Sequence, residues 1–197
     1  MGRSSAAGPA VQASYMKNLF AALDEGGRLG RLVEADPELI AEVEAAPRTA
    51  WLPIALNVRV VEAMARAFGA ERGITILAEC VYAQFDTPLW RNFVAGGIRL
   101  LGRDPGSLGR WIPQALKLVF RDCGVWSAER SAPSELTVTA QELPPELASH
   151  ELWIRSLAVG FTPLLTLCGA SGTSELATLD ADAGSATFVV RWKGEAP

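Results

Sequence analysis

The side chains that most often perform catalysis or bind metals are few and widely separated in this sequence. His150 is the only histidine, and the three cysteines, Cys80, Cys123 and Cys168, have no CxxC spacing and no neighbouring histidine. Catalytic triads and zinc sites need several such groups close together. A lone histidine beside the start of a helix is more often a surface residue than a ligand. We therefore predict no catalytic residue, no metal site and no cofactor, and a protein that is not an enzyme.

Two groups of charged residues have an ordinary structural explanation. Asp180 and Asp182 could chelate a cation, but they lie between two predicted strands without an oxygen-rich loop around them. Arg110, Lys117 and Arg121 could bind an anionic group, but they recur on the polar side of an apolar helix pattern. We interpret the two aspartates as part of a hairpin turn and the basic residues as a solvent-exposed helix face.

Large apolar side chains are the more informative candidates. The six tryptophans could line a ligand pocket, although aromatic residues at core spacing more often simply fill the core. Both interpretations stay open at this stage. If the chain has a pocket, the residues that we expect in its wall are Trp90, Trp111, Trp153, Leu157 and Phe161.

A long apolar helix organises the C-terminal half of the sequence. We expect Ser149 to cap it and the helix to run from Glu151 to Leu167. Its apolar residues occupy more than one face, so that it must be covered on two sides. The glycines of segment 169–173 then end it in a turn.

Two predicted β-hairpins flank this helix. Segments 125–130 and 135–142 precede it, and apolar and polar residues alternate in the second of them, which indicates one buried and one solvated face. Segments 174–179 and 186–192 follow the helix and pair across a short polar loop. The order is therefore hairpin, helix, hairpin.

The N-terminal half has a helical period instead. Asp36-Pro37 and Asp104-Pro105 each combine an N-cap residue with a proline in the first helical position, and Gly96-Gly97 suggests a close helix contact. Segment 72–85 has enough β-branched residues that part of it could be a strand. The predicted helices are 11–23, 37–47, 53–69, 72–85, 87–101 and 105–119.

These patterns predict an α+β fold, in which an N-terminal helical half is followed by a four-stranded antiparallel sheet. We expect a flexible leader over residues 1–13 and a single domain over residues 14–193. The net charge of −4 and the lack of a basic cluster argue against nucleic acid as a partner. Unpaired cysteines and the absence of a long apolar run indicate a cytoplasmic protein without a transmembrane segment.

The order of elements over residues 50–192 resembles a ligand-binding superfamily. Its members are haem–nitric oxide sensor domains, vinyl-4-reductase domains and small subunits of the Golgi tethering complex TRAPP. The resemblance rests on the helix 151–167, the turn 168–173, the strand 174–179, the loop 182–185 and the end strand 186–192. Within the superfamily the chain is most similar to an uncharacterised paralogous family of myxobacteria, which has a counterpart of segment 101–121.

The sequence also departs from each branch of that superfamily. Haem sensors need an axial histidine on a central helix and a Tyr-x-Ser-x-Arg motif, and both are missing here. Vinyl-4-reductase domains usually have cysteines in the last hairpin, where this chain has Leu179 and Ala186. TRAPP subunits can carry a fatty acyl group on a cysteine, for which Cys80 is the only candidate by region.

The resemblance implies a non-catalytic domain that binds a small apolar ligand or a protein partner in a sensory or regulatory role. The alternative is a structural or assembly subunit that acts only through protein contacts. In either case the surplus of amphipathic helices in the N-terminal half predicts a homodimer.

Overall fold

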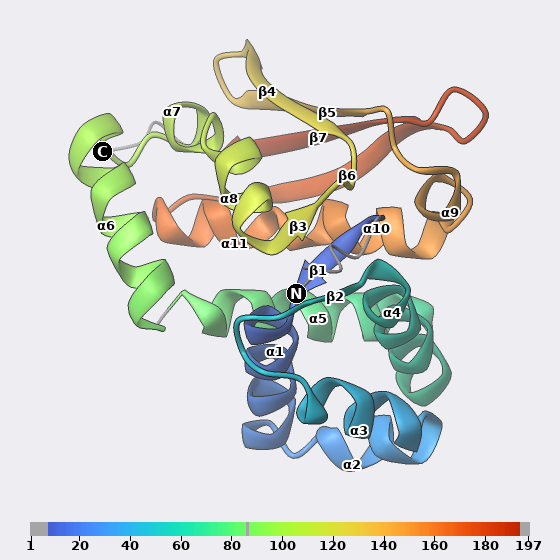
Figure 1. The fold of residues 1–197 in the computed structure, drawn as a ribbon. Helices are drawn as coiled ribbons and strands as arrows, with labels where there is room; N and C mark the ends of the chain where they lie inside the picture. Colours follow the sequence, from blue (N-terminus) through green and yellow to red (C-terminus); the bar gives the residue numbers. More distant parts are fainter. Residues whose placement is uncertain (1–7, 86, 194–197) are drawn as a thin grey trace, which may run out of the picture.

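The computed structural model describes residues 8–85 and 87–193 (Figure 1). These residues form helices and two antiparallel sheets. The main chain begins in a small sheet and five helices, and it ends in a larger sheet that covers two further helices. The first five helices are α1 (Ala13–Glu25), α2 (Leu29–Ala35), α3 (Pro37–Ala45), α4 (Ile54–Phe68) and α5 (Ala70–Gln84). The predicted helix in segment 72–85 is confirmed through Gln84, and no part of α5 is the strand that the β-branched residues left open.

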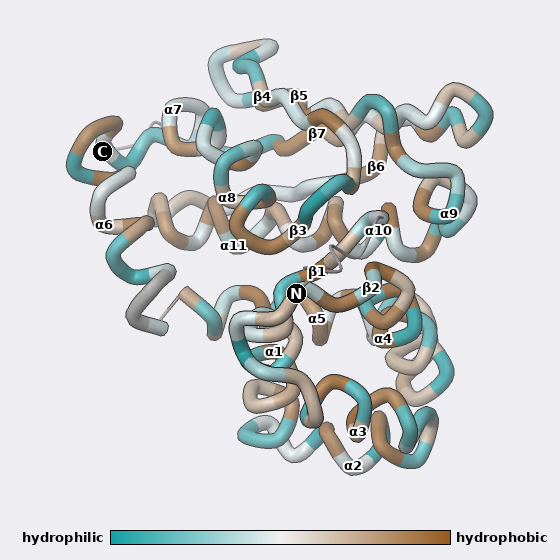
Figure 2. Tube along the Cα trace, in the orientation of Figure 1, coloured by the Kyte–Doolittle hydropathy of each residue, from teal (hydrophilic) through white to brown (hydrophobic). Residues whose placement is uncertain are grey.

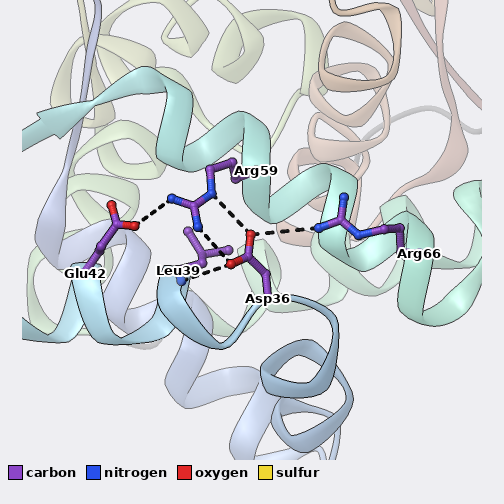
Figure 3. Close-up of polar contacts among 5 residues, drawn as sticks. All are labelled: Asp36, Leu39, Glu42, Arg59 and Arg66. Carbon is purple, nitrogen blue, oxygen red and sulfur yellow. Dashed lines mark hydrogen bonds and ion pairs between the residues drawn. The ribbon is translucent and has the colours of Figure 1, made fainter.

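Asp36 joins α2 and α3 to α4, as Figure 3 shows. Its carboxylate accepts a hydrogen bond from the backbone N–H of Leu39 at 3.1 Å, which confirms the predicted N-cap. The guanidinium of Arg59 donates to the same carboxylate at 2.8 and 3.2 Å and to Glu42 at 2.7 Å, and Arg66 lies 3.8 Å from it. The hydrogen bonds from Arg59 lower the pKa of Asp36 below its usual value. The ion-pair cluster therefore favours the charged form of Asp36.

The small sheet corrects the predicted leader. It has the order β2–β1–β3, with β1 at Ala10–Gln12, β2 at Trp51–Pro53 and β3 at Phe120–Arg121. Residues 10–12 are thus the central strand and not a flexible leader, and Ala13 already belongs to α1. A strand of three residues is too short to show an alternating pattern in the sequence. Residues 1–7 of the predicted leader lie outside the described residues.

The third group of helices is α6 (Pro88–Leu101), α7 (Pro105–Gly109) and α8 (Ile112–Val119). Asp104 caps α7 as predicted, because its carboxylate accepts a hydrogen bond from the N–H of Ser107 at 2.7 Å. The predicted single helix over 105–119 is wrong, since it breaks into α7 and α8. Pro113 has no N–H to donate to the carbonyl of Gly109, which is the bond that would continue the helix.

The larger sheet confirms the two predicted hairpins. Its strands have the order β4–β5–β7–β6, and every neighbouring pair is antiparallel. The alternating residues of β5 and β7 are fully buried on one face, among them Leu136, Val138, Phe188 and Val190. The strands are β4 (Val125–Ala132), β5 (Glu135–Gln141), β6 (Ser171–Asp180) and β7 (Ser185–Lys193).

The central helix lies between this sheet and the N-terminal helices, as Figure 1 shows. It is two helices, α10 (Glu151–Gly160) and α11 (Thr162–Leu167), because Pro163 cannot donate to the carbonyl of Val159. The predicted Ser149 cap is wrong: Ser149 follows the short helix α9 (Pro145–Ala148), and His150 precedes α10 without a side-chain cap.

The helices α3 and α4 in Figure 2 carry both hydrophobic and hydrophilic segments, as expected where one face packs against a core. None of the helices within 8–85 and 87–193 is both long enough and apolar enough to cross a membrane.

Candidate functional site

A cavity of about 160 Å³ lies between the N-terminal helices and the pair α10 and α11. Its wall is mostly apolar and comes from α1, α4, α5, α6, α8, α10 and α11. The N-terminal helices α4 and α5 contribute aliphatic residues to the wall, such as Val60, Val61 and Leu77. A mostly apolar, partly open cavity of this size is suited to a small apolar molecule.

Four aromatic rings form a continuous side of this cavity. Phe85 at the end of α5 meets Trp90 of α6 edge-on, with ring centroids 5.8 Å apart. Trp90 meets Phe93 at 5.8 Å, and Phe93 meets Trp111 at 5.1 Å. These ring contacts link α5, α6 and the start of α8.

Gly97 allows α6 to lie close to this wall. A β-carbon at Gly97 would come within 3.0 Å of Leu108 and 3.3 Å of the Trp111 ring. The predicted close helix contact is therefore confirmed at Gly97, whereas Gly96 faces open space.

Leu157 of α10 and Phe161, which follows α10, form another part of the cavity wall. The ring of Phe161 also contacts Phe188 of β7 edge-on at 5.4 Å, so that it is shared between cavity and sheet. Four of the five residues predicted for a pocket wall thus border the cavity: Trp90, Trp111, Leu157 and Phe161. Trp153 does not border it.

Trp153 instead binds a residue of the cavity wall, Asn57. It is buried, and its indole N–H donates to the side-chain oxygen of Asn57 at 2.8 Å. The amide nitrogen of Asn57 donates to the sulfur of Met16 at 3.2 Å. Asn57 borders the cavity, and it thereby joins α1, α4 and α10 around it.

The sequence reasoning missed the polar residues of the cavity wall, namely Tyr15, Asn57, Gln84 and Ser156. A signal for two of them exists. Asn57 lies three residues after Ile54, and Gln84 lies seven residues after Leu77, so that both continue buried helix stripes. A polar residue on an apolar stripe is the informative exception.

The acidic groups near the cavity are held in their neutral forms. Burial raises the pKa of Tyr15 well above its usual range, and the nearby Cys80 adds to the effect. Burial likewise raises the pKa of the Cys80 thiol to about 11. Neither a phenolate nor a thiolate is therefore favoured here at neutral pH.

The other residues singled out from the sequence lie elsewhere. His150 is 43% exposed, with its Nδ1 atom 3.7 Å from a carboxylate oxygen of Glu62. Asp180 accepts a hydrogen bond from the backbone N–H of Ala183 at 2.9 Å, which confirms the hairpin turn. Arg110 and Lys117 are exposed, and Arg121 lies over the ring of Trp51. Within the described part of the chain, no group of three or more His, Cys, Asp or Glu residues could hold a metal ion.

Comparison with known proteins identifies the fold. No protein-family model and no curated protein matches the sequence. Among solved structures, the Fe(II) unliganded H-NOX protein from K. algicida matches 93% of this chain and 97% of its own, with a TM-score of 0.64 and 8% identity. This chain has the H-NOX fold.

Further H-NOX structures agree. A mutant of T. Tengcongensis H-NOX matches 93% of this chain and 98% of its own, with a TM-score of 0.62 and 9% identity. An oxygen-binding H-NOX domain related to soluble guanylate cyclases has the same TM-score and identity, and it covers 94% of this chain and 96% of its own. The predicted resemblance to haem–nitric oxide sensor domains is confirmed for the fold. The parts that concern vinyl-4-reductase domains, TRAPP subunits and the myxobacterial family stay predictions.

Proposed function

We propose that this chain is a non-catalytic domain that binds a small apolar ligand without haem, in a sensory or regulatory role. The observation that carries the proposal is the apolar cavity between the N-terminal helices and α10 and α11. The shared fold supports it, because solved H-NOX structures include an oxygen complex. The fold by itself does not define the ligand, so that the ligand must be inferred from the cavity wall.

The wall residues do not fit haem. Haem iron is held by a histidine, a thiolate, a methionine or a tyrosinate. The described wall of the cavity has no histidine, cysteine or methionine, and burial disfavours the ionised form of Tyr15. His150 is half-exposed beside Glu62 and is absent from the wall. The described wall also has no lysine or arginine that could pair with haem propionates.

The cavity volume sets the size of the ligand. A cavity of about 150 Å³ lined by leucine, isoleucine and phenylalanine stays dry and binds benzene or xenon. The volume of about 160 Å³ here therefore suits a molecule of similar size. Leu157 and Phe161 would contact it, and so would Trp90 and Trp111.

Ethylbenzene tests the proposal in thermal unfolding experiments, with native mass spectrometry to detect any ligand retained on purification. A ligand that binds only the folded state stabilises it, by about 2.7 kcal/mol at a hundred times its Kd. We expect ethylbenzene to raise the Tm of the wild type and to lose this effect in Leu157→Trp, because the larger ring occupies the cavity.

Val125→Trp is the matched control, since Val125 is 55% exposed and lies outside the cavity wall. It should leave the ethylbenzene effect unchanged. If ethylbenzene leaves the wild-type Tm unchanged and no ligand is retained, the proposal fails. The assembly-subunit interpretation then takes its place.

We also infer that the protein works in a reducing compartment such as the cytoplasm. Cys80, Cys123 and Cys168 are all unpaired and buried, which is typical of cysteines in reduced proteins. Fractionation of the source cells with an antibody against the protein would test this inference, and recovery in an oxidising compartment would overturn it.

A further inference from the structure

Two polar side chains are buried among the residues that the structure describes, and they differ in one respect. Asn57 has hydrogen-bond partners on both sides of its amide, namely Trp153 and Met16. Gln84 is only 3% exposed, and neither its amide nitrogen nor its amide oxygen has a hydrogen-bond partner among the described residues. Both residues border the cavity.

An unpaired carboxamide in an apolar wall is unfavourable, because it has lost its hydrogen bonds to water without replacement. Two other polar groups of the wall are engaged. The hydroxyl of Ser156 donates to the carbonyl of Trp153 at 2.7 Å, and the backbone carbonyl of Gln84 itself accepts from Thr87. Gln84 is thus a buried polar side chain of the described wall whose amide donor and acceptor are both open to a ligand.

We propose, building on the function proposed above, that Gln84 recognises a neutral ligand that carries a hydrogen-bond donor beside an acceptor on a compact apolar body. A primary carboxamide or a lactam has this arrangement, and it can form two hydrogen bonds with the side-chain amide of glutamine. The apolar body then lies against the aromatic and aliphatic wall.

Charge excludes a carboxylate from the same position. The described wall contains no lysine, arginine or histidine, so that a buried anion would have no counter-charge. Arg48 lies in a neighbouring cavity, beyond Tyr15 and Trp90, and its guanidinium is bound to the side chain of Asn18. A neutral head group is therefore favoured over an anionic one of the same shape.

Calorimetric titration with benzamide, benzoate and ethylbenzene tests this proposal, because the three probes have similar shapes. The wild type should bind benzamide at least tenfold more tightly than benzoate at pH 7. Gln84→Met keeps the side-chain length and removes both amide atoms, and it should weaken benzamide binding by roughly tenfold. The same variant should bind ethylbenzene as tightly as the wild type or more tightly.

Gln114→Met is the matched control, because Gln114 is exposed on α8 and lies outside the cavity wall. It should change none of the three affinities. Gln84→Leu repeats the test with a shorter apolar side chain if the methionine variant does not fold.

The outcomes separate this proposal from the broader one. If ethylbenzene binds but Gln84→Met leaves benzamide affinity unchanged, Gln84 does not recognise the ligand and the cavity still binds apolar molecules. Preferential binding of benzoate would also overturn the proposed ligand class. If none of the probes binds the wild type, both proposals fail.

Discussion

Truncation of Phe161 distinguishes a cavity wall from a filled core. Phe161→Ala removes a ring that borders the cavity on one side and contacts Phe188 on the other. Replacement of a fully packed phenylalanine by alanine costs about 3–5 kcal/mol, because surrounding atoms lose contacts that they only partly recover. On the cavity side of Phe161 there are fewer contacts to lose. We therefore expect a loss of about 2–3 kcal/mol in the free energy of unfolding.

Phe188→Ala is the control with which the loss of stability in Phe161→Ala should be compared. Phe188 is fully buried, lies outside the cavity wall, and contacts two rings: Phe161 at 5.4 Å and Trp126 at 5.8 Å. Both variants lose the contact between the two phenylalanines, but Phe188→Ala also loses the stacked contact with Trp126, and such contacts contribute about 0.5–1.5 kcal/mol each. Phe188→Ala should therefore cost about 3–5 kcal/mol, more than Phe161→Ala.

Urea unfolding of the wild type and both variants measures the two losses, provided that the slope of the free energy against urea is the same for all three proteins. Titration with ethylbenzene on the same samples should show altered affinity in Phe161→Ala and little change in Phe188→Ala. Equal destabilisation by the two substitutions, together with no binding of the probe to any of the three proteins, would refute the reasoning.

Three further predictions concern the ion-pair cluster, the absence of colour and the oligomeric state. Asp36→Ala should lower the free energy of unfolding by about 1–3 kcal/mol at pH 7, because it removes the cap of α3 and the hydrogen bonds from Arg59. Since those bonds lower the pKa of Asp36 in the folded state, its contribution is present above pH of about 4 and is lost as the pH falls through the folded-state pKa. The free energies of unfolding of the wild type and Asp36→Ala, measured by urea titration, should therefore converge in acid. An undiminished difference between them at acid pH would contradict the stabilising role of the Asp36 carboxylate. The purified protein should be colourless and metal-free, which an absorption spectrum and elemental analysis would check; a Soret band or stoichiometric iron or zinc would overturn it. Two chains should associate through the N-terminal half, where Tyr82 and Leu100 are exposed, and Leu100→Glu should weaken the dimer; a monomer mass in light scattering at every concentration would count against this.

Signals that act over a few residues predicted the fold well. The caps at Asp36 and Asp104 are where the sequence placed them, and so are both hairpins of the larger sheet. Each depends on a short-range rule: a carboxylate that accepts from an N–H two or three residues later, or a period of two along a strand.

The errors in the predicted helices and strands arose where these short-range rules conflict or do not apply. Pro113 and Pro163 sit on apolar stripes that continue across the breaks they cause, so that periodicity alone joined α7 to α8 and α10 to α11. β1 was not predicted because its stability comes from pairing with segments that are distant in the chain.

The cavity wall was predicted in part. Large apolar residues such as Trp90 and Phe161 were the natural candidates, and they do border the cavity. Trp153 is also a large aromatic residue at core spacing, yet its indole N–H donates to Asn57. This orientation depends on the rotation of α10 about its axis, which the local sequence does not determine. The position of Gln84 on a buried stripe of α5 was a signal in its own segment, but the lack of a partner for its amide is a property of the folded surroundings.

The central position of β1 has a consequence for how the chain folds during synthesis. Residues 10–12 leave the ribosome before either of their partner strands, because Val11 pairs with Leu52 on one side and with Phe120 on the other. The first pairing can form once Pro53 has been made, whereas the second must wait for Arg121. Contacts between such distant segments require closure of long loops and slow the folding of a domain. Until β3 is made, one edge of β1 stays unpaired in the growing chain, where it could join another nascent chain, and slow translation would prolong that interval.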